Sequence, residues 1–137
     1  MVAVIVAAHP AHARALHAFQ RLSASKRNEL FMCAHSLAEL FAVLTRMPTS
    51  PRIGPDLAKR LVNENIEQAN IRILSLDVTD YLAVLDQMAE AGLMGGIVYD
   101  MLILQAAQIA KVDRVLTLNE SDFSRLPKET SVDIAAP

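Results

Sequence analysis

A glycine turn passes into an apolar helix at residues 92–103, which read GLMGGIVYDMLI. Gly95 and Gly96 are expected to break the preceding element, because glycine pairs mark turns. The residues from Tyr99 to Ala110 are almost wholly apolar and predict a buried helix. Its first turn contains a single carboxylate, that of Asp100. An acid at the start of an otherwise apolar helix is a candidate functional group.

Two further segments place polar groups in comparable positions. Residues 116–123, LTLNESDF, follow a short β-like run and contain Asn119 and Asp122. Residues 36–40, SLAEL, place Glu39 at the start of another apolar helix. In parallel α/β sheets, sites form at the carboxyl ends of the strands. Three acids in separate segments, each near a helix start or a strand end, therefore suggest one shared metal site.

The size and composition limit the class of protein. The chain has 137 residues, of which 53% are hydrophobic, and this suits one domain with a substantial core. No apolar run approaches the roughly 20 residues that span a bilayer, so we expect no membrane partner. The one cysteine, Cys33, fits a reducing compartment, and we expect a cytoplasmic protein.

A formal net charge of −2 argues against a protein that coats nucleic acid. Any contact with RNA must therefore be local and depend on arginines. A proline-rich loop at residues 47–55 is surrounded by four cations, and these either contact phosphates or only solvate a helix end. They are Arg46, Arg52, Lys59 and Arg60.

Strands and helices alternate along the chain, which predicts a parallel sheet covered by helices. Short apolar runs predict strands at residues 2–7, 30–33, 71–74, 114–118 and 131–134. Helical periodicity predicts helices after Pro10 and at 36–46, 56–69, 79–91 and 99–110. Ser36 is a candidate N-cap, with Glu39 at the spacing of a capping box. Asp77 or Thr79 is expected to cap the helix that ends near Ala91.

The combination of these motifs resembles the PIN domain, and within it the VapC-like toxin ribonucleases of bacterial toxin–antitoxin pairs. The pattern is S-x-x-E-L, then G-G-x-x-Y-D, an apolar helix and L-T-x-N-x-x-D-F, between about His9 and Leu126. The resemblance implies a three-layer α/β/α sandwich with a mostly parallel central sheet, formed by one domain over residues 1–137. In that family, three or four acidic residues bind Mg²⁺ or Mn²⁺ and hydrolyse RNA phosphodiester bonds.

The resemblance also implies roles for individual residues and partners. Glu39 matches the second acidic position of the family and Asp100 the third, while Asn119 and Asp122 fall in the fourth region. It thus implies a catalytic set of Glu39, Asp100, Asp122 and Asn119, with Glu39, Asp100 and Asp122 as metal ligands. The implied partners are an RNA substrate, a cognate antitoxin protein and a second copy of the chain in a homodimer.

One departure from the family leads to an alternative function. The family opens with a strand that ends in Asp, whereas this sequence has no Asp before Asp56. Residues 1–8 resemble the segment after that Asp, so the start of the first strand is expected to be absent. The alternative is a degenerate, catalytically impaired PIN fold that acts as an RNA- or protein-binding module.

Each candidate residue also has a purely structural interpretation. Asp100 could favour the helix dipole, and Glu39 could belong to the capping box with Ser36. Asn119 and Asp122 could satisfy the backbone of the turn before Phe123. The four histidines have no accompanying cysteine pair, so a zinc site is not predicted.

Overall fold

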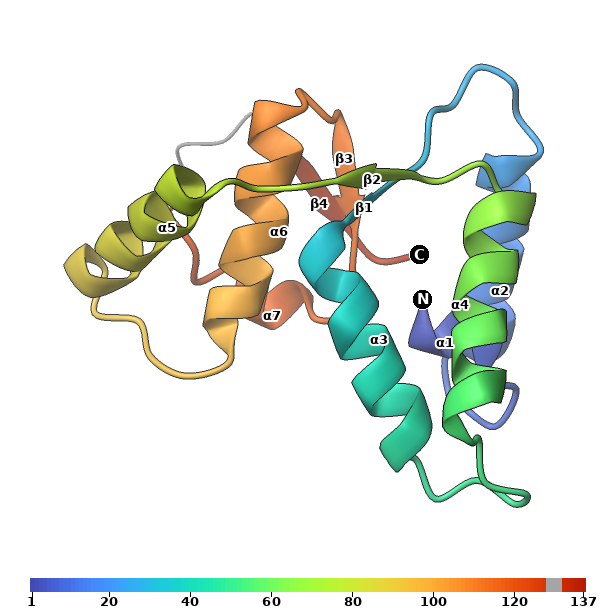
Figure 1. The fold of residues 1–137 in the computed structure, drawn as a ribbon. Helices are drawn as coiled ribbons and strands as arrows, with labels where there is room; N and C mark the ends of the chain where they lie inside the picture. The colour runs from blue at the N-terminus through green and yellow to red at the C-terminus, as the bar shows by residue number, and fades with distance from the viewer. Residues whose placement is uncertain (128–131) are drawn as a thin grey trace. The chain divides into compact units, whose positions relative to one another are not determined.

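The computed structural model describes residues 1–127 and 132–137 (Figure 1). The chain forms two compact units, the first from residues 1–32 and 36–73, the second from residues 33–35 and 74–137. The elements in chain order are α1 (Val2–Ile5), α2 (His12–Ser23), β1 (Phe31–Cys33), α3 (Ala34–Arg46), α4 (Pro55–Gln68), β2 (Arg72–Leu74), α5 (Val78–Glu90), α6 (Ile97–Ile109), β3 (Arg114–Leu116), α7 (Glu120–Phe123) and β4 (Asp133–Ala135).

The strands are short and pair two by two. β1 pairs with β2, and β3 pairs with β4. The second pair is parallel, with Val115 opposite Ile134. The predicted α/β class with parallel strands is confirmed. Strands were expected at the positions of all four, although Ser131, with which the last one was to begin, lies outside the described residues.

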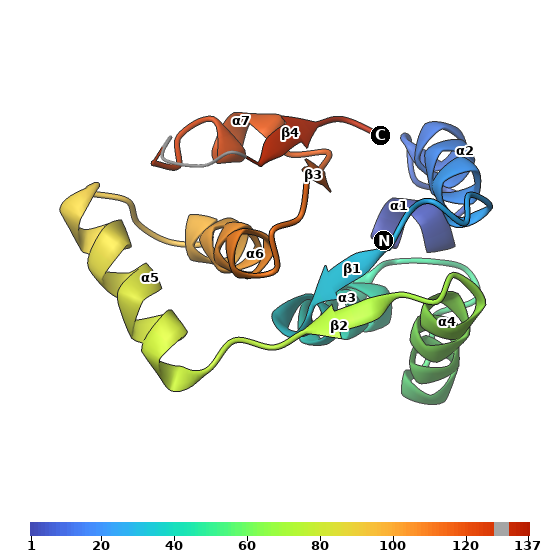
Figure 2. The same ribbon diagram turned by 90° about the horizontal axis from the view of Figure 1, so that it is seen from above.

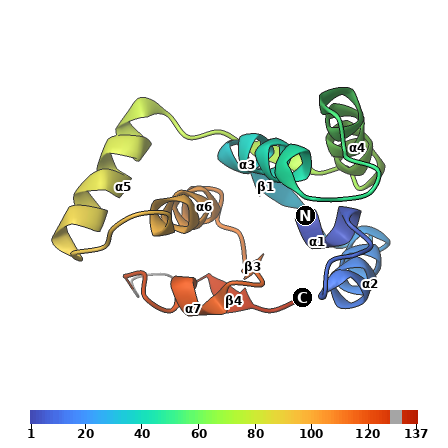
Figure 3. The same cartoon turned by 90° about the horizontal axis from the view of Figure 1, so that it is seen from below.

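In the first unit, α1 contacts α2, and the two helices lie beside each other in Figure 3. A separate cluster of buried side chains joins the N-terminal segment to α3 and α4 through Val6, Leu40, Leu44, Ala58 and Val62. Leu44 and Ala58 are completely buried. Leu40 and Leu44 on α3 are four residues apart, as are Ala58 and Val62 on α4. This is the spacing of an apolar helix stripe, which explains why both helices were predictable.

The prediction of a strand at residues 2–7 is wrong. Val2–Ile5 form a short helix, in which the carbonyl of Met1 accepts hydrogen bonds from the amides of Val4 and Ile5. Val2 and Ile5 pack against the cluster around Leu44. A short, continuous apolar run does not distinguish a buried strand from a buried helix, so packing decided the outcome.

The predicted cap at Ser36 is also wrong. α3 begins at Ala34, directly after β1, so Ser36 and Glu39 both lie inside the helix. The capping box expected between these two residues is therefore not the start of α3. β1 ends at Cys33 and α3 begins at the next residue, so no turn residue separates them. The spacing of Ser36 and Glu39 therefore suggested a helix start that the chain does not use.

The second unit is built around α6. Figures 2 and 3 show α6 between α5 on one side and α7 with β4 on the other. One hydrophobic cluster unites these elements, with Val84 from α5, Met101 and Leu104 from α6, Phe123 from α7 and Val132 just before β4. α6 is buried on several faces because nearly all its side chains are apolar.

α5 begins with a complete capping box. The carboxylate of Asp77 accepts a hydrogen bond from the amide of Asp80, and Asp80 accepts one from the amide of Asp77. The first of these bonds lowers the pKa of Asp77 below its usual value. Of the two predicted caps, Asp77 and Thr79, the structure shows Asp77.

Across the described part of the chain, no helix is long and apolar enough to cross a membrane.

Candidate active site

Asp100 lies in the first turn of α6, as predicted, and its side chain is half-buried. Gly95, with φ of +75°, adopts the left-handed conformation that glycine allows, and Gly96 is the N-cap. Ile97 and Met101 are buried on either side of Asp100 in the sequence. The apolar anchors therefore leave the carboxylate at the positive end of the helix dipole, where negative charge is favoured.

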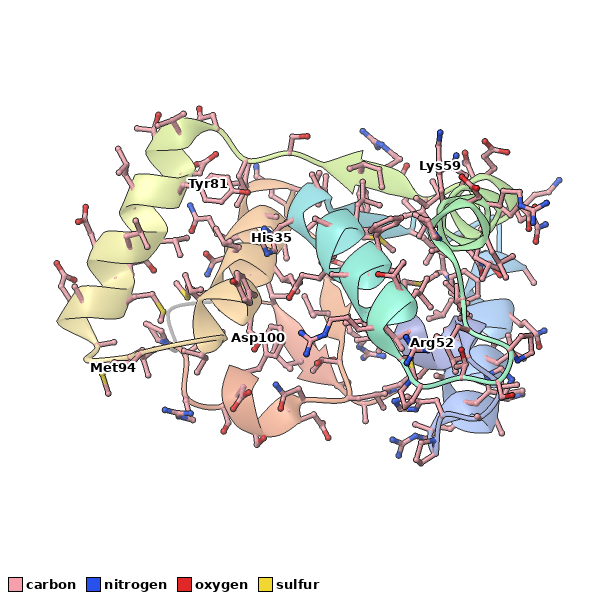
Figure 4. All side chains as sticks on the ribbon, turned by 60° about the horizontal axis from the view of Figure 1, so that its bottom comes forward. His35, Arg52, Lys59, Tyr81, Met94 and Asp100 are labelled. Atoms are coloured by element: carbon pink, nitrogen blue, oxygen red, sulfur yellow. The ribbon has the colours of Figure 1, made fainter. Side chains whose placement is uncertain are left out.

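The first turn of α6 is contacted by the segment 33–35. The rings of His35 and Tyr99 are stacked, with centroids 4.7 Å apart and an angle of 17° between their planes. Cys33 is buried, and its Sγ lies 4.0 Å from the carbonyl oxygen of Leu102. Figure 4 shows His35 and Asp100 among the side chains around α6. Sequence reasoning considered His35 only as a zinc ligand and gave Tyr99 no role.

The segment from Thr117 through α7 to Arg125 forms a small polar network. The hydroxyl of Thr117 accepts a hydrogen bond from the amide of Asn119, and the side-chain amide of Asn119 donates to Asp122 Oδ2. The second carboxylate oxygen, Oδ1, lies 3.7 Å from Arg125 Nη1. Both oxygens of Asp122 are thus engaged by neighbours within a few residues, which agrees with the structural interpretation of this loop.

The three predicted acids are distributed over both units. Glu39 is half-buried on α3 in the first unit, whereas Asp100 and Asp122 belong to the second. The approach of Glu39 to Asp100 therefore stays a prediction. Among residues 1–127 and 132–137, no three His, Cys, Asp or Glu side chains are grouped so as to hold a metal ion.

The donor chemistry of two of these acids fits a hard cation. Mg²⁺ and Mn²⁺ prefer carboxylate oxygens and retain several waters, so they need few protein ligands. Asp100 and Glu39 supply such oxygens from half-buried helix positions. Asp122 fits less well, since a cation would compete with Arg125 and Asn119 for its oxygens. Asp122 is thus better placed to support the loop than to bind directly.

Two of the histidines have local structural contacts. Nδ1 of His9 accepts a hydrogen bond from the amide of Ala11. Nδ1 of His12 lies 2.9 Å from the carbonyl oxygen of Ala3. The His12 contact joins α1 to the start of α2, and the His9 contact joins the preceding loop to the N-cap of α2, so both side chains have structural roles.

These features define an α/β domain with carboxylates in early helical turns. A family model of the PIN domain matches residues 1–129, and the chain belongs to this family. The chain is 34% identical to Ribonuclease VapC27 of Mycobacterium tuberculosis over 106 residues, which are 77% of this chain and 70% of that protein. It is 32% identical to Ribonuclease VapC40 of the same species over 110 residues, 80% of this chain and 75% of that protein.

Proposed function

We propose that the protein is a metal-dependent endoribonuclease that acts as the toxin of a type II toxin–antitoxin pair. The observation that carries this proposal is the position of Asp100, in the first turn of α6 after the glycine turn, within a PIN domain. The similarity to two proteins named ribonucleases supports RNA as the substrate. We place the activity in the cytoplasm, where such a toxin meets RNA.

In this proposal, Asp100 and Glu39 bind Mg²⁺ or Mn²⁺. When bound, the ion would shield charge on the attacked phosphate and lower the pKa of a water. Asp100 holds its carboxylate at a fixed place because Ile97 and Met101 anchor the same helical turn in the core. Asn119, at the N-cap of α7, and Asp122, within α7, are joined by a hydrogen bond and contribute to the site from this segment.

An RNA cleavage assay tests this function. We expect the wild-type chain to cut RNA with Mg²⁺ or Mn²⁺ and to stop when a chelator is added. Asp100→Asn keeps the shape of the side chain and removes its charge, so the rate should fall by about 10²-fold or more. Asp113→Asn is the matched control, because Asp113 is an exposed acid before β3. RNA binding without cleavage, unchanged by chelator, would support the binding-module alternative.

We also propose where the antitoxin binds. A groove of about 210 Å³ lies between α3 and α4 in the first unit. It is lined by Leu37, Phe41, Lys59, Val62, Asn63 and Ile66. An apolar floor with a lysine at its edge suits an amphipathic segment that carries acidic residues. Phe41→Asp should weaken binding of the antitoxin in a pull-down with the co-expressed partner, and full binding by this variant would refute the location.

We propose that the toxin is a homodimer. One face of α5 exposes apolar side chains at helical spacing, Val78, Leu82 and Leu85, of which Val78 is 76% exposed. Such a stripe suits a symmetric helix–helix contact between two copies. Light scattering should give the mass of a dimer, and Leu82→Lys should give a monomer. A monomeric wild-type chain at high concentration would contradict this proposal.

A further inference from the structure

The start of α6 has little local support. Its N-cap is Gly96, and no side chain caps the helix. The residue before it, Gly95, has a left-handed backbone, and a Cβ added at either glycine would meet nothing within 4 Å. The amides of Val98 and Tyr99 donate to the carbonyls of Gly95 and Gly96, so backbone hydrogen bonds close the first turn while no capping side chain fixes its exposed side. This turn contains Asp100, the residue on which the proposed function depends.

Two contacts from the segment 33–35 lie along this turn. His35 stacks on Tyr99, the residue directly before Asp100, and Cys33 contacts the carbonyl of Leu102. Tyr99 and Leu102 are three residues apart, one turn along the helix, so the two contacts enclose Asp100 in the sequence. Met101 is buried in the core, whereas Tyr99 is 44% exposed and stacks on His35.

The chemistry of His35 indicates that its ring face is what matters. Nε2 is buried and has no hydrogen-bond partner within the described ranges. A buried polar atom without a partner destabilises the folded state, so hydrogen bonding by Nε2 does not explain a histidine at position 35. The observed contact is the nearly parallel stack with Tyr99. Aromatic pairs in offset stacks attract each other beyond the area that they bury.

We propose that His35 is a positioning residue that holds Tyr99, and through it Asp100, by the face of its ring. The inference rests on the proposed function of Asp100. His35 itself takes no part in proton transfer or metal binding in this account. A planar ring at position 35 is therefore required, and its nitrogen atoms are dispensable.

The test compares His35→Ala, which removes the ring, with His35→Phe, which keeps a ring and removes both nitrogens. In RNA cleavage, His35→Ala should lower kcat by about tenfold or more with little change in KM, because misplacing a catalytic group costs rate. His35→Phe should stay within about threefold of the wild type, since it retains the stacking face. Equal losses in both variants would overturn the proposal, as would full activity of His35→Ala.

Mn²⁺ affinity, measured by calorimetry, separates this inference from the proposed function. If the wild type binds Mn²⁺ through Asp100 but does not cut RNA, the proposed function is wrong. The role of His35 is then supported if His35→Ala weakens Mn²⁺ binding and His35→Phe does not, and it is wrong otherwise. If the wild type cuts RNA and His35→Ala cuts equally fast, the inference fails and the function stands. A chain that neither binds nor cuts overturns both.

Fluorescence reports on the stack directly. The chain has two tyrosines and no tryptophan, so Tyr81→Phe leaves Tyr99 as the sole intrinsic fluorophore of this kind. In that background, His35→Ala should lower the anisotropy of Tyr99, because its ring gains freedom, and His35→Phe should not. If His35→Ala does not fold, Tyr99→Leu and Tyr99→Phe, made in the wild-type background, provide the same comparison from the other ring in the RNA cleavage assay. Unchanged anisotropy in a folded His35→Ala variant would contradict the stack.

Discussion

Helices α5 and α6 have the same length of 13 residues and contact each other, yet they begin in different ways. The start of α5 is fixed locally, by the reciprocal hydrogen bonds of Asp77 and Asp80. The start of α6 has no side-chain cap and is contacted by His35, a residue far away in the sequence. Of the two helices, the one without a side-chain cap, α6, contains the candidate catalytic acid Asp100.

The two helices also differ in burial. α6 has several buried side chains on different faces, including Leu102, Leu104 and Ala106. In α5 only Val84 and Met88 are buried, and Leu82 and Leu85 are each 55% exposed. α6 thus acts as the centre of the core of the second unit, and α5 covers it. A change in α6 should therefore affect stability much more than a change on the outer face of α5.

The largest expected effect follows from this difference in burial. Leu104→Ala should reduce the free energy of unfolding by about 2–5 kcal/mol, because Leu104 is completely surrounded and the cavity cannot fully collapse. Leu85→Ala, the matched control on α5, should change it by less than about 0.5 kcal/mol in the monomer, in which Leu85 is 55% exposed. Urea denaturation of both variants measures this. Comparable losses, measured at dilutions at which the chain is a monomer, would contradict the difference in burial between the two helices.

A smaller effect is expected at the glycine turn before α6. Gly95→Ala should destabilise the protein by roughly 1–2 kcal/mol, because φ of +75° is unfavourable for a residue with a Cβ. Gly96 has φ of −65°, so Gly96→Ala should be neutral or stabilise by about 0.4–1 kcal/mol. Thermal unfolding of the two variants tests this pair. Equal midpoints of thermal unfolding for the two variants would contradict the left-handed conformation of Gly95.

The smallest effect concerns the cap of α5 and depends on pH. Because folding lowers the pKa of Asp77, its carboxylate stabilises the folded state at neutral pH. This contribution should be lost as the pH falls below the ordinary aspartate value of about 3.9, towards the lowered pKa. Asp77→Asn retains a capping oxygen and should flatten this part of the pH profile. Identical profiles for the variant and the wild type, measured between pH 2 and 7, would contradict the assignment.

Much of the fold was predictable from local patterns. Apolar periodicity predicted most of the helices, and the cap of α5 was narrowed to Asp77 or Thr79, of which the structure shows Asp77. The segment at Val2–Ile5 was not predictable, because an apolar run of that length fits a strand equally well. The start of α3 was misplaced because Ser36 imitates a cap inside a continuous strand-to-helix transition.

The site was predictable to the extent that it depends on position along one helix. Asp100 lies where the glycine turn and the apolar run placed it. The contact between Asp122 and Arg125 did not follow from spacing alone, because an acid and a base three residues apart meet only where the chain forms a helical turn. The stack of His35 on Tyr99 joins distant parts of the chain, and no local pattern signals it.

The proposed function depends most on whether Glu39 and Asp100 bind the same metal ion, as we propose. Calorimetric titration with Mn²⁺ of the wild type, Glu39→Gln, Asp100→Asn and the double variant tests it most directly. We expect each single variant to weaken binding by roughly tenfold or more and the double variant to be little weaker than either, because two ligands of one ion are coupled. Strictly additive losses, or Mn²⁺ affinity unchanged by either substitution, would contradict the account.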